Sequence, residues 1–87
     1  MSTFPIEIVT PEGLKLCDEI ESLLVRTDDG DVEILAGHAD LIASVSNGRI
    51  RIIEDGGEKR FGSVNGGILS IIDGKVRLCV IEFKLEK

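Results

Sequence analysis

Residues 68–83 read ILSIIDGKVRLCVIEF, and this stretch carries a complete strand–turn–strand pattern. At its centre is Asp73-Gly74, a pair that suits a tight two-residue hairpin turn because both positions accept positive φ angles. After the turn, Val76, Leu78 and Val80 alternate with Lys75 and other residues of the opposite face. A period of two is that of a strand with one buried face. The stretch therefore predicts a β-hairpin.

Strand signals of the same kind recur along the rest of the chain. Phe4, Ile6 and Ile8 alternate with polar neighbours at the start. Further strands are predicted at residues 14–27, 32–35, 41–45, 49–53 and 59–64. Asn47-Gly48 predicts another hairpin turn, and Gly66-Gly67 predicts a bulge or a sharp bend. With interrupted segments counted separately, these signals amount to about eight to ten short strands.

Composition supports an all-β fold. The chain has 12 Ile, 7 Val and 9 Leu but only 3 Ala, and branched side chains favour strands over helices. Its 87 residues suffice for one small domain. We therefore expect residues 1–87 to form a single antiparallel β-sandwich or flattened barrel.

Charge and residue content exclude several classes of function. The formal net charge of −6 argues against nucleic-acid binding, which requires a basic face. Apolar runs of about four residues are far too short to insert into a bilayer, so any membrane role would pass through a protein partner. Residues 1–40 carry 10 acidic and 2 basic side chains. This imbalance fits either solvated faces or an acidic end that meets a basic partner.

Candidate catalytic and ligand-binding residues are few. His38 is the only histidine, and Cys17 and Cys79 fall on predicted strands, where cysteines usually serve packing. We expect both to be free thiols. The acidic turn at residues 28–33 lacks the spacing of a calcium loop, and Gly66-Gly67 lacks the residues of a phosphate-binding loop. We expect no active site, no metal and no cofactor.

One stretch is more specific than its composition. Residues 29–41, DGDVEILAGHADL, resemble the EGE-x-G-I-L-P-G-H-A-P-L signature of the epsilon subunit of F-type ATP synthases. Three other blocks resemble this family in the same order: FPIEIVTPEG at residues 4–13, GRIRI at 48–52, and FGSVNGGIL at 61–69 followed by DGKV at 73–76. The resemblance covers almost the whole chain.

The resemblance implies a ten-stranded β-sandwich and a non-catalytic role in the central stalk. Such a domain would pack against the gamma subunit and sit on the polar loops of the membrane c-ring, coupling ion-driven rotation to ATP synthesis. It would be peripheral, at the cytoplasmic face of the energy-coupling membrane. The family continues into a helical hairpin that inhibits ATP hydrolysis and in some members binds ATP. This sequence ends at Lys87, so neither role is assigned to it.

The resemblance also implies contact residues. Asp31 falls where the family has the Glu beside the c-ring loops, and Gly37-His38 falls on the family's Gly-His in the adjacent loop. For His38 the alternative is a loop histidine bonded to local backbone. Asp40 replaces a Pro of the family and Glu33 replaces a Gly, so both add negative charge at the expected c-ring end.

Near the end of the chain, Ile81 and Phe83 fall on the polar face of the last predicted strand. Apolar residues there need cover from a neighbouring strand or from a partner. We expect that cover to be gamma, or a second copy paired edge to edge. A second hypothesis is a stand-alone β-sandwich adaptor that kept the fold and changed its partner. A small enzyme or metal-binding protein ranks third.

Overall fold

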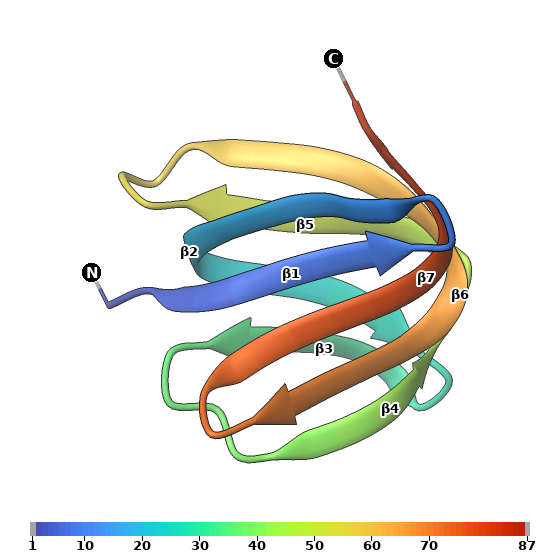
Figure 1. The fold of residues 1–87 in the computed structure, drawn as a ribbon. Coiled ribbons are helices and arrows are strands. Elements are labelled where there is room, and N and C mark those ends of the chain that lie inside the picture. The colour runs from blue at the N-terminus through green and yellow to red at the C-terminus, as the bar shows by residue number, and fades with distance from the viewer. Residues whose placement is uncertain (1, 87) are drawn as a thin grey trace.

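The computed structural model describes residues 2–86, which form seven β-strands and no helix (Figure 1). The strands are β1 (Phe4–Thr10), β2 (Gly13–Thr27), β3 (Gly30–Leu35), β4 (Leu41–Val45), β5 (Gly48–Glu54), β6 (Lys59–Ile72) and β7 (Lys75–Leu85). Within that span nothing forms a helix long and apolar enough to cross a membrane. The all-β prediction is confirmed.

The strands form two packed sheets. The first sheet comprises the start of β2, then β1, the start of β7, the end of β6 and β4. The second sheet comprises β3, the end of β2, β5, the start of β6 and the end of β7. Every pair is antiparallel except β1–β7, which is parallel with Ile6 opposite Val76. The sequence did not predict that parallel pair.

Three long strands belong to both sheets. β2, β6 and β7 bend from one layer into the other, as Figure 1 shows for β6 and β7 at one end of the molecule and for β2 at the opposite end. Two of them, β2 and β6, carry two separate strand signals each in the sequence. The predicted count of eight to ten strands was therefore too high, because it counted the two arms of a bent strand separately.

The bend in β6 and β7 moves the buried face by one residue. Val64 and Phe83 lie opposite each other on one side of the bend, and Gly67 and Val80 on the other, so the register of the pair is unchanged. Across the bend, successive inward-facing residues are three positions apart in each strand, whereas they are two apart in a regular strand. A Cβ on Gly67 would lie 1.9 Å from the carbonyl oxygen of Cys79. The sharp bend predicted at Gly66-Gly67 is confirmed, and this close backbone approach explains the glycine at position 67.

The hairpin turn predicted at Asn47-Gly48 is wrong. β4 and β5 do not pair with each other, because both pair with β6 in one continuous register, with Val45 opposite Gly67 and Gly48 opposite Val64. The chain therefore runs on through residues 46 and 47 without reversing. There the side-chain oxygen of Asn47 accepts a hydrogen bond from the Gly66 amide at 2.6 Å. The amide side chain thus bridges the interruption between the two strands.

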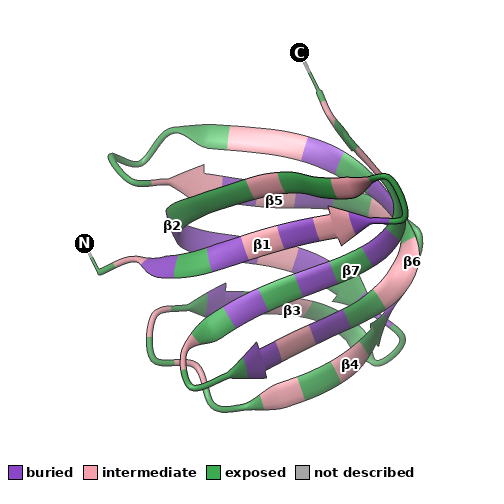
Figure 2. Ribbon diagram, in the orientation of Figure 1, coloured by how far each residue is buried: buried purple, intermediate pink, exposed green. Residues whose placement is uncertain are grey.

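The core lies between the sheets and is almost wholly aliphatic. Along β1 and the first part of β7, buried and more exposed residues alternate, as Figure 2 shows. Full burial of each such side chain contributes roughly 1.5–3 kcal/mol. The core side chains with the least exposure are Ile6, Ile8, Ile20, Leu23, Val25, Ile34, Ile50, Leu69, Ile71 and Leu78.

Candidate partner-binding surface

Asp31 lies near the start of β3, beside the β2–β3 turn. It stands opposite Arg26 in the β2–β3 pair, and the Arg26 Nε donates a hydrogen bond to Asp31 Oδ1 at 3.1 Å. Both side chains are more than half exposed. An exposed ion pair of this kind contributes little to stability, so the Asp31 carboxylate is accessible to a partner.

The loop between β3 and β4 holds the other three residues that the signature singled out. Gly37 has a φ of 83°, which favours glycine. The Nδ1 of His38 lies 2.7 Å from the carbonyl oxygen of Ala39 and donates to it, since a carbonyl can only accept. Asp40 Oδ1 accepts a hydrogen bond from the Asp73 amide at 3.0 Å. The loop is therefore tied to the β6–β7 turn.

The structure does not bring Asp31 and His38 together. β3 runs from the β2–β3 turn to the opposite end of the sandwich (Figure 1). At ~3.3 Å per residue, the five steps from Asp31 to Ala36 span roughly 17 Å. The expectation that these residues belong to one end of the domain is therefore wrong. Sequence proximity was misleading because a strand separates residues that a loop would keep close.

Ile81 and Phe83 also have different surroundings. The bend in β7 turns Phe83 inward, where it is partly buried and packs against the core. Ile81 lies at the bend itself and is 71% exposed. The cover expected for Phe83 thus comes from the domain itself, and only Ile81 remains available to a partner.

The outer surface of the first sheet carries an apolar patch beside its charged residues Glu7, Lys75 and Arg77. One row crosses five strands through successive paired residues: Ser44, Ile68, Cys79, Val9 and Leu14. Five of the six exposed large hydrophobic side chains lie on this surface or at its rim. The apolar face consists of Leu14, Ile42, Ile68, Ile72, Cys79 and Ile81.

Sequence reasoning did not single out the isoleucines of β4 and β6. The signal was present in the adjacent apolar pairs Leu41-Ile42 and Ile71-Ile72. Because successive side chains of a strand point to opposite faces, an apolar pair places one member outside. Such pairs therefore indicate a strand that carries an apolar side chain on its outer face as well as on its buried face.

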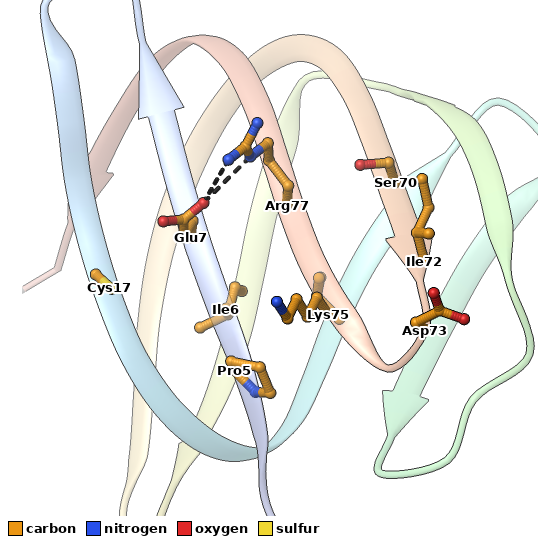
Figure 3. A pocket seen from close by; sticks show the side chains of 10 residues that line it. Pro5, Ile6, Glu7, Cys17, Ser70, Ile72, Asp73, Lys75 and Arg77 are labelled. Atoms are coloured by element: carbon orange, nitrogen blue, oxygen red, sulfur yellow. Dashed lines mark hydrogen bonds and ion pairs between the residues drawn. The ribbon is translucent and has the colours of Figure 1, made fainter.

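A hollow of about 630 Å³ opens beside the apolar face (Figure 3). Its walls come from β1, β2, β6 and β7 and include Cys17, Ile72 and Lys75. The Nε and Nη2 of Arg77 donate to Glu7 Oε1 at 3.2 and 2.8 Å. These hydrogen bonds raise the pKa of Arg77 above its already high usual value. The pair places two charges in the wall of a hollow that Asp73 and Lys75 also line.

The outer surface of the second sheet has the opposite character. Arg26–Asp31 and Arg51–Glu33 pair across its strands. Arg49 donates two hydrogen bonds to Glu86, at 2.8 and 2.9 Å, and its guanidinium lies 4.0 Å from the centre of the Phe61 ring. The charges of this surface are largely satisfied within the domain.

Clusters of potential metal ligands and the two cysteines were the remaining candidate chemical features of the chain. Groups of three or more metal-ligating side chains are absent between residues 2 and 86. Cys17 and Cys79 are free thiols, as expected, but both are exposed, so the prediction that they serve packing is wrong. The sequence could not show which face of its strand each thiol occupies.

Comparison with known families assigns this fold. The family described as "ATP synthase, Delta/Epsilon chain, beta-sandwich domain" matches residues 3–85. The chain belongs to this family. The resemblance seen in residues 29–41 and in the three further blocks is thereby confirmed, and the match includes both the apolar face and the β3–β4 loop.

Curated relatives of the ATP synthase delta/epsilon family agree. The chain is 36% identical to the ATP synthase epsilon chain of Caldicellulosiruptor saccharolyticus over 76 residues, which are 87% of this chain and 55% of the relative. It is 34% identical to that of Bacillus thuringiensis over 76 residues, or 87% of this chain and 56% of the relative. The chain therefore spans about half the length of these relatives.

Two solved structures share the fold. A chain in the cryo-EM structure of Euglena gracilis mitochondrial ATP synthase, OSCP/F1/c-ring in rotational state 1, has a TM-score of 0.91 at 21% identity and is matched over 98% of this chain and 54% of its own length. A chain in the central stalk/c-ring structure of Tetrahymena thermophila mitochondrial ATP synthase has a TM-score of 0.78 at 14% identity, with 92% and 64% covered. At these identities the likeness establishes the fold alone.

Proposed function

We propose that this domain is part of a non-catalytic central-stalk subunit of an F-type ATP synthase. It links the gamma subunit to the c-ring, and so couples ion-driven rotation of the ring to ATP synthesis in the catalytic head. Family membership and the names of the relatives support this role. The domain is then peripheral at the cytoplasmic face of the membrane, attached through its partner subunits.

The apolar face is the observation that carries this proposal. Small soluble domains rarely leave several large aliphatic side chains exposed on one sheet surface, and such a patch marks an interaction site. Ile42 and Ile81 are 70% and 71% exposed. Gamma is the occupant we assign to this face, because a rotor subunit must transmit torque through a stable contact and apolar burial is the main source of such stability.

The two ends of the sandwich then have different partners. The loop with Gly37, His38 and Asp40 leads directly into β4, which contributes Ile42 to the apolar face. We therefore assign this loop to the gamma side. The β2–β3 end with Asp31 lies at the opposite end of β3 from this loop. We assign it to the polar c-ring loops, whose basic or amide groups an exposed carboxylate can bind.

The two exposed cysteines provide a direct test. Cys79 belongs to the apolar face and Cys17 lines the adjoining hollow. When the gamma subunit from the same source is added, maleimide labelling of both thiols should slow by at least tenfold. A Ser63→Cys variant adds a control thiol on the outer surface of the second sheet, where labelling should continue at its original rate. Equal labelling of all three thiols with and without gamma would contradict the proposal.

The alternative is an adaptor that kept the fold and changed its partner. Glu33 and Asp40 suggested it, because they add charge where the family is uncharged. Both side chains have partners within the domain: Glu33 pairs with Arg51, and Asp40 binds the Asp73 amide. These internal contacts account for the two carboxylates without a new partner. Size-exclusion chromatography with gamma separates the hypotheses, since an adaptor would elute alone or as a self-associated dimer.

A further inference from the structure

The hollow beside the apolar face has a lysine in its wall. Lys75 lines the hollow, and no hydrogen bond or ion pair of its ammonium is found within residues 2–86. Figure 3 shows its side chain directed toward β1, whereas Asp73, two residues earlier, points away from it. We propose that a carboxylate side chain of gamma enters this hollow and binds Lys75 and Arg77. This inference rests on the proposed function.

Continuity with the apolar face supports this location. Ile72 belongs to the apolar face and also lines the hollow, so a partner that covers one also covers the other. A lysine enclosed by such a contact would lose its hydration, which costs several kcal/mol unless an anion replaces the water. The partner must therefore supply an acceptor at this point, and a carboxylate is the common anionic side chain of proteins.

The carboxylate of Glu7 in the wall of the hollow does not prevent an anion from binding there, because Arg77 pairs with it. Both hydrogen bonds that Arg77 donates to Glu7 end on the same oxygen, Oε1. Arg77 therefore neutralises Glu7 and keeps its Nη1 as a further donor, since a guanidinium has five N–H groups. Lys75 and Arg77 are two positions apart in β7, so their side chains lie on the same face of the strand. Together they offer an incoming carboxylate two charged donors from one rigid strand.

The test compares two lysines of the same strand. Lys75 lies in the hollow, and Lys84 is exposed on the outer surface of the second sheet. We expect Lys75→Glu to weaken binding to the gamma subunit by roughly tenfold to hundredfold, and Lys84→Glu to leave it within about twofold. Lys75→Gln, which removes the charge without reversing it, should give an intermediate loss. Thermal unfolding of each variant verifies that it is folded.

A second measurement identifies the partner group. In the Lys75→Glu background, each surface Asp and Glu of gamma is replaced in turn by Lys, and one such replacement should restore most of the lost affinity. Unchanged binding of Lys75→Glu, or an equal loss with Lys84→Glu, would overturn the inference and leave the proposed function intact. Failure of the unsubstituted chain to bind gamma would instead remove the proposed function, and the inference with it.

Discussion

The two outer surfaces of this sandwich differ although the same three strands contribute to both. The first sheet exposes isoleucines at positions 42, 68, 72 and 81. The second sheet exposes ion pairs that close upon themselves, with Arg49 held by Glu86 and stacked over Phe61. A surface whose polar groups are already paired within the domain gains little binding free energy from contact with a partner. A surface of exposed aliphatic side chains gains much more when it is buried, so the first sheet is the side expected to bind a partner.

The bent strands allow this difference. β6 and β7 each present one outward set of residues on the first sheet and another on the second. One continuous strand can therefore be apolar outside in one layer and charged outside in the other. The alternation that identifies a strand does not show this division, which depends on where the strand bends.

The largest expected effect concerns the bend itself. Gly67→Ala places a methyl group 1.9 Å from the Cys79 carbonyl oxygen, a distance that requires the backbone of β6 or β7 to move. We expect a loss of about 3 kcal/mol or more in the free energy of unfolding, measured by urea denaturation. Ser63→Ala, on an exposed position of the same strand, should change it by less than about 0.5 kcal/mol. Equal midpoints for the two variants would refute the role given to the glycine.

The next effect separates binding from stability. Ile68→Asp places a charge in the apolar face without disturbing the core, because Ile68 is 52% exposed. Affinity for gamma should fall by about a hundredfold, corresponding to about 3 kcal/mol, while the unfolding free energy changes by less than about 1 kcal/mol. Ser63→Asp makes the matched change on the second sheet and should leave the affinity unaltered. Comparable losses from both substitutions would show that the two surfaces do not differ in function.

A smaller effect is expected at the loop that passes from one sheet to the other. Asp40→Ala removes the acceptor for the Asp73 amide and should lower stability by about 1 kcal/mol. Asp40→Asn keeps an oxygen acceptor and should recover most of that loss. Hydrogen exchange at the Asp73 amide reports the contact directly, since it should accelerate in the Ala variant. An exchange rate that is the same in all three proteins would show that the tie is not maintained in solution.

The smallest effect concerns the charges of the second sheet. Hydrogen bonds from Arg49 lower the pKa of Glu86. A carboxyl group with a lowered pKa in the folded state stabilises the fold above its unfolded pKa, and this contribution disappears as the pH falls through the folded value. The melting temperature of the unsubstituted protein should thus exceed that of Glu86→Gln slightly near pH 7, and the two should converge once the pH has fallen below the lowered pKa of Glu86. Because both groups are exposed, added salt should reduce the difference. A gap that persists in acid would mean that Glu86 acts by packing.

Several features of the fold could be predicted from local sequence alone. The hairpin around Asp73-Gly74 and the bend at Gly66-Gly67 follow from glycine content and alternation, which are properties of neighbouring residues. The turn at Asn47-Gly48 was predicted wrongly, because the same dipeptide also suits an interruption that a side chain can bridge. The β1–β7 pair could not be predicted, since it joins segments some 70 residues apart.

The candidate site was predictable only in part. The signature implied partner contacts at Asp31, Gly37 and His38 and an added charge at Asp40, but it could not show that β3 holds Asp31 and the loop at opposite ends. Ile81 was recognised as uncovered, whereas Phe83 was not recognised as covered. The apolar face and the Lys75 hollow were missed, because their residues come from four or five strands that are distant in sequence.

By itself, the sequence determined an all-β domain, its strands and most of its turns, and membership of the ATP synthase delta/epsilon family. These properties depend on side-chain alternation, on branched residues and on the backbone freedom of glycine, all of which act over a few residues. Only the tertiary structure decided which outward residues share a surface. That outcome depends on strand order and on the position of each bend, which arise from contacts between segments far apart in the chain.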